Sequence, residues 1–103
     1  MHMMRRKKQD AQKAIAKERI ETLFAQAEEM FAQHPDLSKR YVVLARKIAE
    51  KYRIHFTKEQ KQHFCKQCNA YLRQGANARV RLQHGTRVIR CLECNHLKRM
   101  NYR

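Results

Sequence analysis

Cys65-Lys66-Gln67-Cys68 and Cys91-Leu92-Glu93-Cys94 are the two short stretches that decide the fold of this 103-residue chain. Together they use all four cysteines, and the 22 residues 69–90 separate them. A Cys-x-x-Cys turn holds two thiolates on one side of a tight knuckle, so two such turns can complete a tetrahedron around Zn²⁺. Asn69 and Asn95 each follow a second cysteine, and asparagine tolerates the left-handed backbone that such a knuckle needs. The pattern therefore predicts a zinc ribbon with one zinc ion on Cys65, Cys68, Cys91 and Cys94.

Two other uses of the cysteines are open, a pair of disulfides and a thioredoxin-like redox pair. Residues 1–20 lack the apolar core of a signal peptide, so we expect a cytoplasmic protein, and reducing conditions there favour metal over disulfide. A redox pair needs a βαβ context, which the sequence does not indicate. Because four thiolates leave no coordination position for water, the metal is predicted to be structural rather than catalytic.

The charge of the chain points to a polyanionic partner. There are 24 Lys and Arg residues against 9 Asp and Glu, a formal net charge of +15. Residues 1–52 carry 12 basic and 7 acidic residues, whereas residues 53–103 carry 12 and 2. A nucleic acid binds such a basic chain favourably, because neutralising its phosphates releases condensed counterions. An anionic membrane surface is the alternative, but the chain has neither an apolar run of membrane-spanning length nor a lipidation signal.

The N-terminal half is predicted to form an antiparallel helical hairpin over residues 10–52. The first helix, residues 10–33, ends at His34-Pro35 because proline disfavours helical geometry in the residue before it. Asp36 or Ser38 can cap the second helix, and the short connection makes the two helices neighbours. Apolar residues recur at steps of three and four along both helices. These are Ala16, Ile20, Leu23, Phe24, Ala27, Met30 and Phe31, then Leu37, Tyr41, Leu44, Ala45, Ile48 and Tyr52.

The remaining segments complete a small α+β fold. Residues 1–9 combine what resembles a tag remnant, Met1 to Met4, with a basic run that we predict to be a flexible tip. Residues 53–64 are a basic connector, and residues 65–103 form the ribbon. Alternating polarity predicts a short strand at Tyr71-Leu72 and further strands at 78–83, 86–90 and 97–102, with turns at 73–77 and His84-Gly85.

The helices carry more apolar surface than one hairpin can bury, because Phe24, Phe31 and Tyr41 cannot all face inward. We therefore predict that a protein partner docks on them. The alternative is that the hairpin packs back against the ribbon. The candidate partner contacts are Ile20, Leu23, Phe24, Phe31, Tyr41, Leu44 and Ile48.

The ribbon strands supply the candidate nucleic-acid contacts. Arg79 and Arg81 alternate with Val80 and Leu82, which places the two arginines on one strand face, where guanidinium groups can fork onto phosphate. The full candidate set is Asn77, Arg79, Arg81, Arg87, Arg90, Lys98 and Arg99. Tyr71 and Tyr102 are either stacking platforms for unpaired bases or part of the ribbon packing. For any single arginine, a solvated strand position is an equally good interpretation.

No catalytic constellation is visible. After residue 58 the only carboxylates are Glu59 and Glu93, too few to hold Mg²⁺ for phosphodiester hydrolysis. Four cysteines suffice for the metal, so the histidines near the knuckles are predicted not to be ligands. These are His63, His84 and His96.

Several of these motifs together resemble one family, the archaeal ribonuclease P protein component 4, which has a small counterpart in the eukaryotic nuclear enzyme. The resemblance runs from about Lys7 to Tyr102. Its most specific part is the Gly-x-Asn-x-Arg-x-Arg stretch 75–81 between the knuckles, and Gln74 departs from the Pro that the family often has there. The segments that carry it are 40–42, 44–49, 64–68, 71–72, 75, 77–82 and 91–94 with His96.

The resemblance implies a subunit of the ribonucleoprotein endoribonuclease that removes the 5′ leader of precursor tRNA. In that enzyme the RNA subunit performs the chemistry, and component 4 has no catalytic site of its own. It pairs through its N-terminal helices with an Sm-like barrel subunit, component 1, and the pair binds the specificity region of the ribonuclease P RNA, touching precursor tRNA only indirectly. The alternatives are a DNA-binding, transcription-type zinc ribbon and a thiol oxidoreductase.

Overall fold

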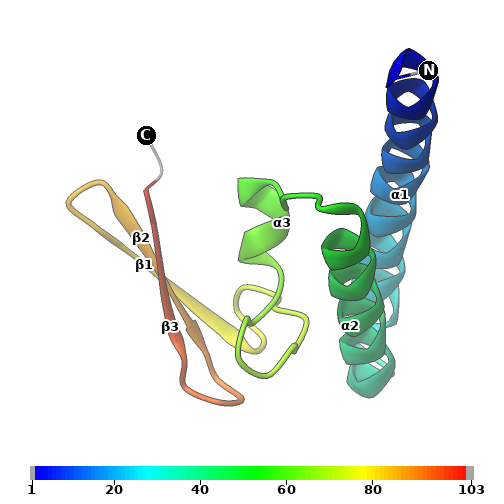
Figure 1. The fold of residues 1–103 in the computed structure, drawn as a ribbon. Helices are drawn as coiled ribbons and strands as arrows, with labels where there is room; N and C mark the ends of the chain where they lie inside the picture. The colour runs from blue at the N-terminus through cyan, green and yellow to red at the C-terminus, as the bar shows by residue number, and fades with distance from the viewer. Residues whose placement is uncertain (1, 102–103) are drawn as a thin grey trace.

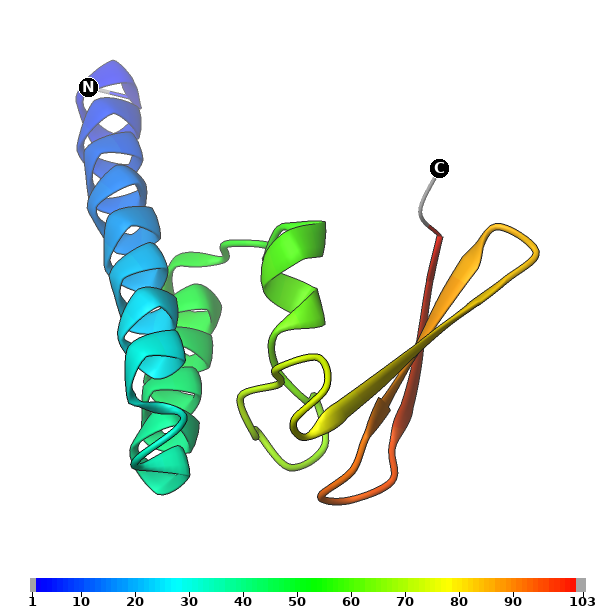
Figure 2. The same ribbon diagram turned by 180° about the vertical axis from the view of Figure 1, so that it is seen from behind.

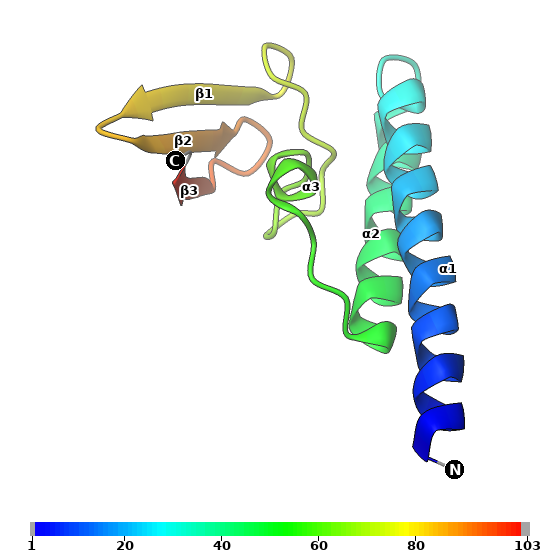
Figure 3. The ribbon, with the colours of Figure 1, turned by 90° about the horizontal axis from the view of Figure 1, so that it is seen from above.

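The computed structural model describes the backbone of residues 2–101 and the side chains of residues 7–101. Three helices precede three strands: α1 His2–Met30, α2 Pro35–Tyr52, α3 Lys58–Gln62, β1 Ala78–Gln83, β2 Thr86–Cys91 and β3 Leu97–Asn101. In Figure 1 the two long helices lie side by side at one end of the molecule, the sheet lies at the other, and α3 lies between them. The views from behind and from above show the same order (Figures 2 and 3). The predicted small α+β fold is confirmed.

The first helix differs from its predicted bounds at both ends. It begins at His2, so residues 2–9 are helical rather than a flexible tip; the Arg, Lys and Gln residues of this segment are good helix formers, and neither Gly nor Pro interrupts them. It ends at Met30, where the carbonyl accepts a hydrogen bond from the His34 amide at 2.7 Å. Among residues 2–101 no helix has the length and apolar character needed to cross a membrane.

The second helix begins without the predicted side-chain cap. His34 occupies the cap position with no side-chain hydrogen bond, and Pro35 fills the first turn, where its missing N–H costs nothing. Ser38 has a different role, because its fully buried hydroxyl donates to the Ala27 carbonyl at 2.5 Å. This bond ties α2 to α1 where small side chains let the helices approach closely. The buried residues of the helix pair include Ala16, Ile20, Ala27, Val42, Ala45 and Ala49.

The hairpin packs back against the ribbon, which is the alternative that the sequence left open. Phe64 and Tyr71, from the two sides of the first knuckle, share a core cluster with Ala27 and Val42 of the helices. The Phe24 ring centroid lies 5.9 Å from that of Phe64, and the Phe31 centroid lies 5.9 Å from that of Tyr71. The helical aromatics do exceed what a hairpin can bury, but the first knuckle and its connector cover them.

The connector contains a helix that the periodicity did not predict. α3 is short, and Thr57 caps it: the Thr57 hydroxyl accepts from the Gln60 amide at 3.1 Å, and the Gln60 side chain accepts from the Thr57 amide at 3.0 Å. This reciprocal pair is a capping box, and Thr-x-x-Gln is its sequence signature. The signal was therefore present, but a single turn shows no apolar stripe.

The three strands form one antiparallel sheet in the order β1-β2-β3. β1 has its predicted bounds, and β2 extends one residue further, to Cys91. His84 and Gly85 join them with φ of 47° and 79°, the two positive values that a tight two-residue hairpin requires. The strand predicted at Tyr71-Leu72 is a single bridge between Phe64 and Tyr71. β3 ends at Asn101, and Tyr102 lies outside the described residues.

A polar contact reinforces the aromatic junction between the helices and the ribbon. The Tyr71 hydroxyl donates a hydrogen bond to the Glu28 carboxylate, and the Arg73 Nη2 donates to Glu28 Oε1 and to the Glu28 carbonyl, both at 2.9 Å. The Tyr71 hydrogen bond lowers the pKa of Glu28, which Arg73 lowers further against the opposing effect of burial. Burial, followed by the bond to Glu28, raises the pKa of Tyr71. Helix α1 is thus held to the first knuckle by charge as well as by packing.

We predict a measurable coupling between Tyr71 and Glu28. In a double-mutant cycle with Tyr71→Phe and Glu28→Ala at neutral pH and saturating zinc, the coupling free energy should be about 0.5–1 kcal/mol, at the low end for a charged bond because solvent reaches the Glu28 side chain. Urea unfolding of the four proteins measures it. Strictly additive effects would show that the two side chains do not interact in solution.

Candidate metal centre and nucleic-acid interface

The two cysteine knuckles have matching backbone geometry. Asn69 and Asn95 adopt left-handed φ values of 64° and 65°, as the sequence predicted. The backbone N–H of Asn69 donates to the Cys65 carbonyl at 2.8 Å, and the backbone N–H of Asn95 donates to the Cys91 carbonyl at 2.7 Å. Each knuckle therefore closes on its first cysteine, and β2 delivers the second knuckle directly because Cys91 is its last residue.

The four thiol sulfurs converge on one point. All lie within 4.8 Å of one another, with Sγ–Sγ distances of 3.5 Å between Cys65 and Cys94 and 3.7 Å between Cys68 and Cys91. A disulfide would bring two sulfurs to about 2.05 Å. A tetrahedral ion with bonds of about 2.3 Å to sulfur sets the sulfurs about 3.8 Å apart. The cluster has the dimensions of a four-thiolate metal site, and no histidine within the described residues belongs to it.

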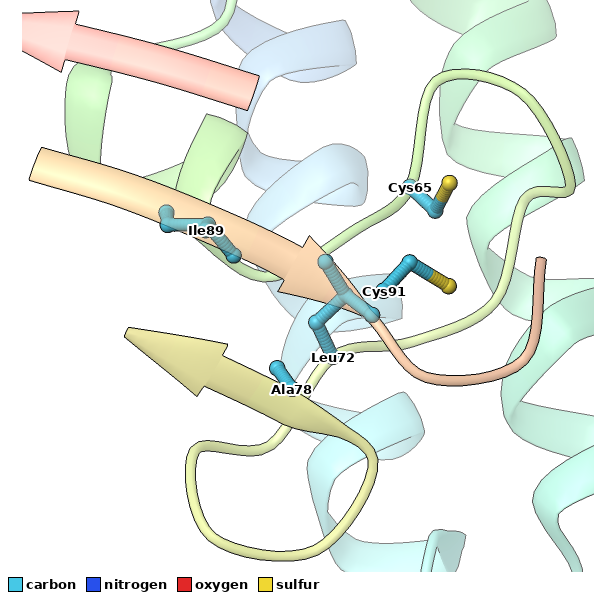
Figure 4. Close-up of a cluster of buried hydrophobic side chains, with 5 residues drawn as sticks. All are labelled: Cys65, Leu72, Ala78, Ile89 and Cys91. Carbon is cyan, nitrogen blue, oxygen red and sulfur yellow. The ribbon is translucent and has the colours of Figure 1, made fainter. Parts of the chain in front are cut away.

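The cysteine cluster is part of the ribbon core. Cys65 and Cys91 are each only 2% exposed and pack with Leu72, Ala78 and Ile89. Figure 4 shows these five side chains, with both labelled sulfurs turned into the space between the two knuckle loops. Since few other apolar side chains stabilise this half of the molecule, the ribbon core depends on the site at its centre.

Burial and backbone hydrogen bonds shift the pKa values of Cys65, Cys68 and Cys91 in the metal-free chain. Burial raises the pKa of Cys68 to about 12 and raises that of Cys91. Burial opposes ionisation of Cys65 as well, but amide donors from Cys68 and Gln67 outweigh it and lower the pKa of Cys65. A metal ion binds thiolates, so it must displace protons here, and its affinity should fall as the pH falls.

The predicted nucleic-acid contacts divide between the two faces of the sheet. The register pairs Arg79 with Arg90 and aligns Arg81, through Val88, with Arg99. Directly opposed residues share a face, so these four arginines lie together, around a shallow hollow of about 300 Å³ on the side of the sheet away from α3. We call Arg79, Arg81, Arg90 and Arg99 the arginine face. Within the described part of the chain the one ion pair is Arg73–Glu28, so no carboxylate neutralises this face.

Arg87 and Lys98 lie on the opposite face from the other predicted basic contacts. Arg87 Nη1 donates to Gln62 Oε1 at 2.6 Å. Lys98 Nζ donates to the Lys61 carbonyl and lies 4.9 Å from the Phe64 ring centroid, and burial lowers its pKa. Both cations therefore bind α3 and its flank. Alternation along β2 already sets 87 and 90 on opposite faces, so the sequence held this signal.

Asn77 has a structural role. Its Nδ2 donates to the Tyr71 carbonyl at 2.7 Å and to Glu93 Oε2 at 2.9 Å, while its Oδ1 accepts from the Arg73 amide at 2.8 Å. These bonds join the first knuckle, the 73–77 turn and the second knuckle. Asn77 is thus occupied within the ribbon, although the sequence grouped it with the nucleic-acid contacts.

The predicted partner contacts on the helices also separate into two groups. Ile20 is 1% exposed between the helices, and Phe24, Phe31 and Tyr41 pack toward the first knuckle. The others line a groove of about 460 Å³ on the outer side of the hairpin. Ile15, which is 52% exposed, also lines it but was missing from the prediction because the stripe was begun at Ala16. We call this the apolar groove; its apolar residues are Ile15, Leu23, Leu44 and Ile48.

Known proteins share this sequence and fold. The family model described as the RNAse P Rpr2/Rpp21/SNM1 subunit domain matches residues 19–95. Ribonuclease P protein component 4 of Methanosphaera stadtmanae is 46% identical over 100 residues, covering 97% of this chain and 96% of that protein. The protein of the same name from Pyrococcus furiosus is 45% identical over 93 residues, covering 87% and 80%.

Two solved structures agree with these sequence matches. A chain in a cryo-EM structure of archaeal ribonuclease P with mature tRNA superposes with a TM-score of 0.80 at 46% identity, covering 86% of this chain and 78% of that one. A structure described as Pfu Rpp21 gives a TM-score of 0.57 at 43% identity, covering 82% and 97%. The family match and the near-full-length relatives confirm the resemblance, and the chain belongs to the archaeal ribonuclease P protein component 4 family.

Proposed function

We propose that this chain is an RNA-binding subunit of an archaeal ribonuclease P, which removes the 5′ leader of precursor tRNA, and that the enzyme's RNA performs the chemistry. The observation that carries the proposal is the arginine face, four guanidinium groups on one side of a sheet without a neutralising carboxylate in the described residues. Family membership supplies the identity of the RNA. In this role the chain contributes binding and positioning, and none of its side chains takes part in bond cleavage.

The metal in this proposal is one structural Zn²⁺ held by the four cysteines. Four thiolates fill a tetrahedral site, so the ion crosslinks the two knuckles and keeps no position for water or substrate. It stabilises the sheet that carries the arginines. The surrounding residues shield Cys65 and Cys91 from solvent. Backbone hydrogen bonds close the two knuckles.

The arginine face suits a phosphate backbone. The register sets Arg79 beside Arg90 across β1 and β2, so neighbouring forks can take oxygens of adjacent phosphates bidentately. Val88 and Leu97 line the hollow between them and can contact ribose or an exposed base. Each phosphate neutralised releases counterions, which makes the affinity strongly dependent on salt.

The apolar groove is the surface we assign to the Sm-like subunit, component 1. Ile15 is 52% exposed, and such apolar side chains at one site on a strongly charged chain mark an interaction surface. The aromatic junction between the hairpin and the first knuckle holds this groove and the arginine face on one connected body. The chain would thereby fix RNA and partner protein relative to each other.

Loss of arginines from the sheet should weaken RNA binding more than loss of the same charge elsewhere. We expect Arg79→Gln/Arg81→Gln to bind an archaeal ribonuclease P RNA transcript more weakly, with a plot of log affinity against log salt shallower by about two units. Lys13→Gln/Lys17→Gln on exposed positions of α1 is the control of equal charge. Filter binding of the zinc-loaded proteins measures both. Equal effects of the two variants would contradict the assignment, and equal wild-type affinity for duplex DNA would favour a DNA-binding ribbon.

A carboxylate in the apolar groove should weaken pairing with component 1. We expect Ile15→Glu to weaken binding of the Sm-like subunit by at least about tenfold, because a charge would be buried without a partner at the contact. Isothermal titration calorimetry measures the affinity. The control is Leu82→Glu, at a position 60% exposed on the sheet, which should pair normally. Unchanged affinity of Ile15→Glu, with its helix content intact, would exclude the groove.

A further inference from the structure

A second groove, of about 730 Å³, lies between the C-terminal half of α2, the segment that leads to α3, and the first knuckle. Its charged lining residues are Arg46, Lys47 and Arg53 against the single carboxylate of Glu50, with His55 beside them. We call it the basic groove. It shares no residue with the arginine face or the apolar groove. The sequence singled out 44–49 for its resemblance, yet neither surface above gives Arg46 or Lys47 a role.

The Arg46 guanidinium is fixed in position at this groove. Its Nη1 donates to the Lys66 carbonyl at 3.1 Å and to the Asn69 side-chain oxygen. Its Cζ lies 5.5 Å from the centroid of the Phe64 ring. Among the described residues no acceptor bonds to Nε or Nη2 of Arg46, and no carboxylate pairs with its charge. The N–H groups on these two nitrogens are therefore free to bind an anion. A guanidinium already immobilised loses little side-chain entropy when it binds an anion.

Arg53, at the same groove, has a backbone conformation that is unfavourable for a residue other than glycine. It ends α2 in the left-handed conformation, with φ of 54°, at the position where helices usually place glycine. An ordinary side chain pays a steric cost in this conformation, which glycine avoids. The helix end itself is well closed, because the Ile54 amide donates to the Ala49 carbonyl at 2.8 Å. An arginine at a position where glycine is the better terminator is a local departure of the kind that often marks a functional site.

We propose that the basic groove is a second RNA-binding surface, which takes backbone phosphates on Arg46, Lys47 and Arg53. The proposal rests on the proposed function and extends it to another side of the molecule. Phosphate fits the pre-positioned fork of Arg46 better than a single carboxylate, because it can offer two oxygens to neighbouring cations at once. The apolar side of the groove, which includes Ile54 and Phe56, offers a surface on which a ribose or base can rest.

This second contact would let one small subunit hold two RNA segments. The arginine face lies on the side of the sheet away from α3, while the basic groove opens beside α2 and the first knuckle. An RNA segment bound only to the sheet would not contact the positive charges of this groove. Two separated contacts restrict the relative position of two backbone segments, which one contact cannot do.

The test compares two variants of the full zinc-loaded chain that each lose two positive charges from α2 or its end. Lys47→Gln/Arg53→Gly alters the basic groove, and Lys39→Gln/Arg40→Gln alters exposed positions at the other end of the helix. Binding to an archaeal ribonuclease P RNA transcript is measured across a salt series. We expect the groove variant to bind several-fold more weakly than the control variant, with a salt dependence shallower by about two units than that of wild type.

Stability separates a binding role of Arg53 from a structural one. The single variant Arg53→Gly should unfold at a temperature no lower than wild type, since glycine suits the left-handed position, and yet bind RNA more weakly. A lower unfolding temperature with unchanged RNA affinity would overturn the proposal. Equal RNA affinities of the two double variants would overturn it too, as would loss of Sm-like subunit binding by the groove variant alone, which would make the groove a protein surface.

Acetylation of lysines gives a direct view of the same contact. With RNA bound, mass spectrometry should show Lys47 several-fold protected and Lys39 unchanged; equal reaction of Lys47 with and without RNA would refute contact.

Failure of the proposed function and failure of the basic-groove proposal give different results. If wild type binds ribonuclease P RNA no more tightly than a folded RNA of equal length, the proposed function fails. The two double variants would still show, on either RNA, whether the basic groove binds RNA.

Discussion

The convergence of four cysteine sulfurs on one point, with the dimensions of a tetrahedral metal site, is the constraint on which the rest of this structure depends. The 22 residues 69–90 separate the two knuckles, and the buried core that joins them consists of two of the cysteines themselves with Leu72, Ala78 and Ile89. So few apolar side chains cannot offset the entropy of ordering a sheet of this size. In small zinc modules the metal contributes on the order of 10 kcal/mol at neutral pH. We therefore expect a bound ion to supply much of the stability that this small core cannot.

The first knuckle connects the cysteine cluster to the helices. The Lys66 carbonyl and the Asn69 side chain that anchor Arg46 belong to that knuckle, and Phe64 and Tyr71 on either side of it cover the helical aromatics. The geometry of this knuckle therefore sets the position of the helical hairpin and the shape of the basic groove. The same short loop links the cysteine cluster, the helical hairpin and both cationic surfaces.

The sequence predicted the parts of this fold that local rules control. The left-handed asparagines, the bounds of β1 and the His84-Gly85 turn follow from residue types and alternation. It did not predict how the two halves meet, because an aromatic residue such as Phe24 is equally suited to a partner protein or to the chain's own knuckle. The short helix α3 also escaped prediction, although Thr57 and Gln60 carry its capping signature.

The candidate sites show the same division. The candidate metal ligands follow from spacing alone, since two Cys-x-x-Cys turns are the usual signature of a four-thiolate zinc site. Alternation within a strand already separates Arg87 from Arg90, but the alignment of one strand with the next required the register, which aligned Arg99 with Arg81 and set Lys98 on the face toward α3. The anchoring of Arg46 joins residues 20 and more positions apart in the chain, a contact that no periodicity reveals.

Hydrogen–deuterium exchange with and without zinc tests most directly whether the metal holds the ribbon together. The zinc-loaded chain and the chain stripped by a chelator would be compared by mass spectrometry, with metal content measured in both. The account predicts that amides of β1, β2 and β3 lose their protection when zinc is removed, while amides buried between α1 and α2 retain most of theirs. Sheet protection that persists in verified metal-free protein would show that the ribbon folds without the ion, and would contradict the account.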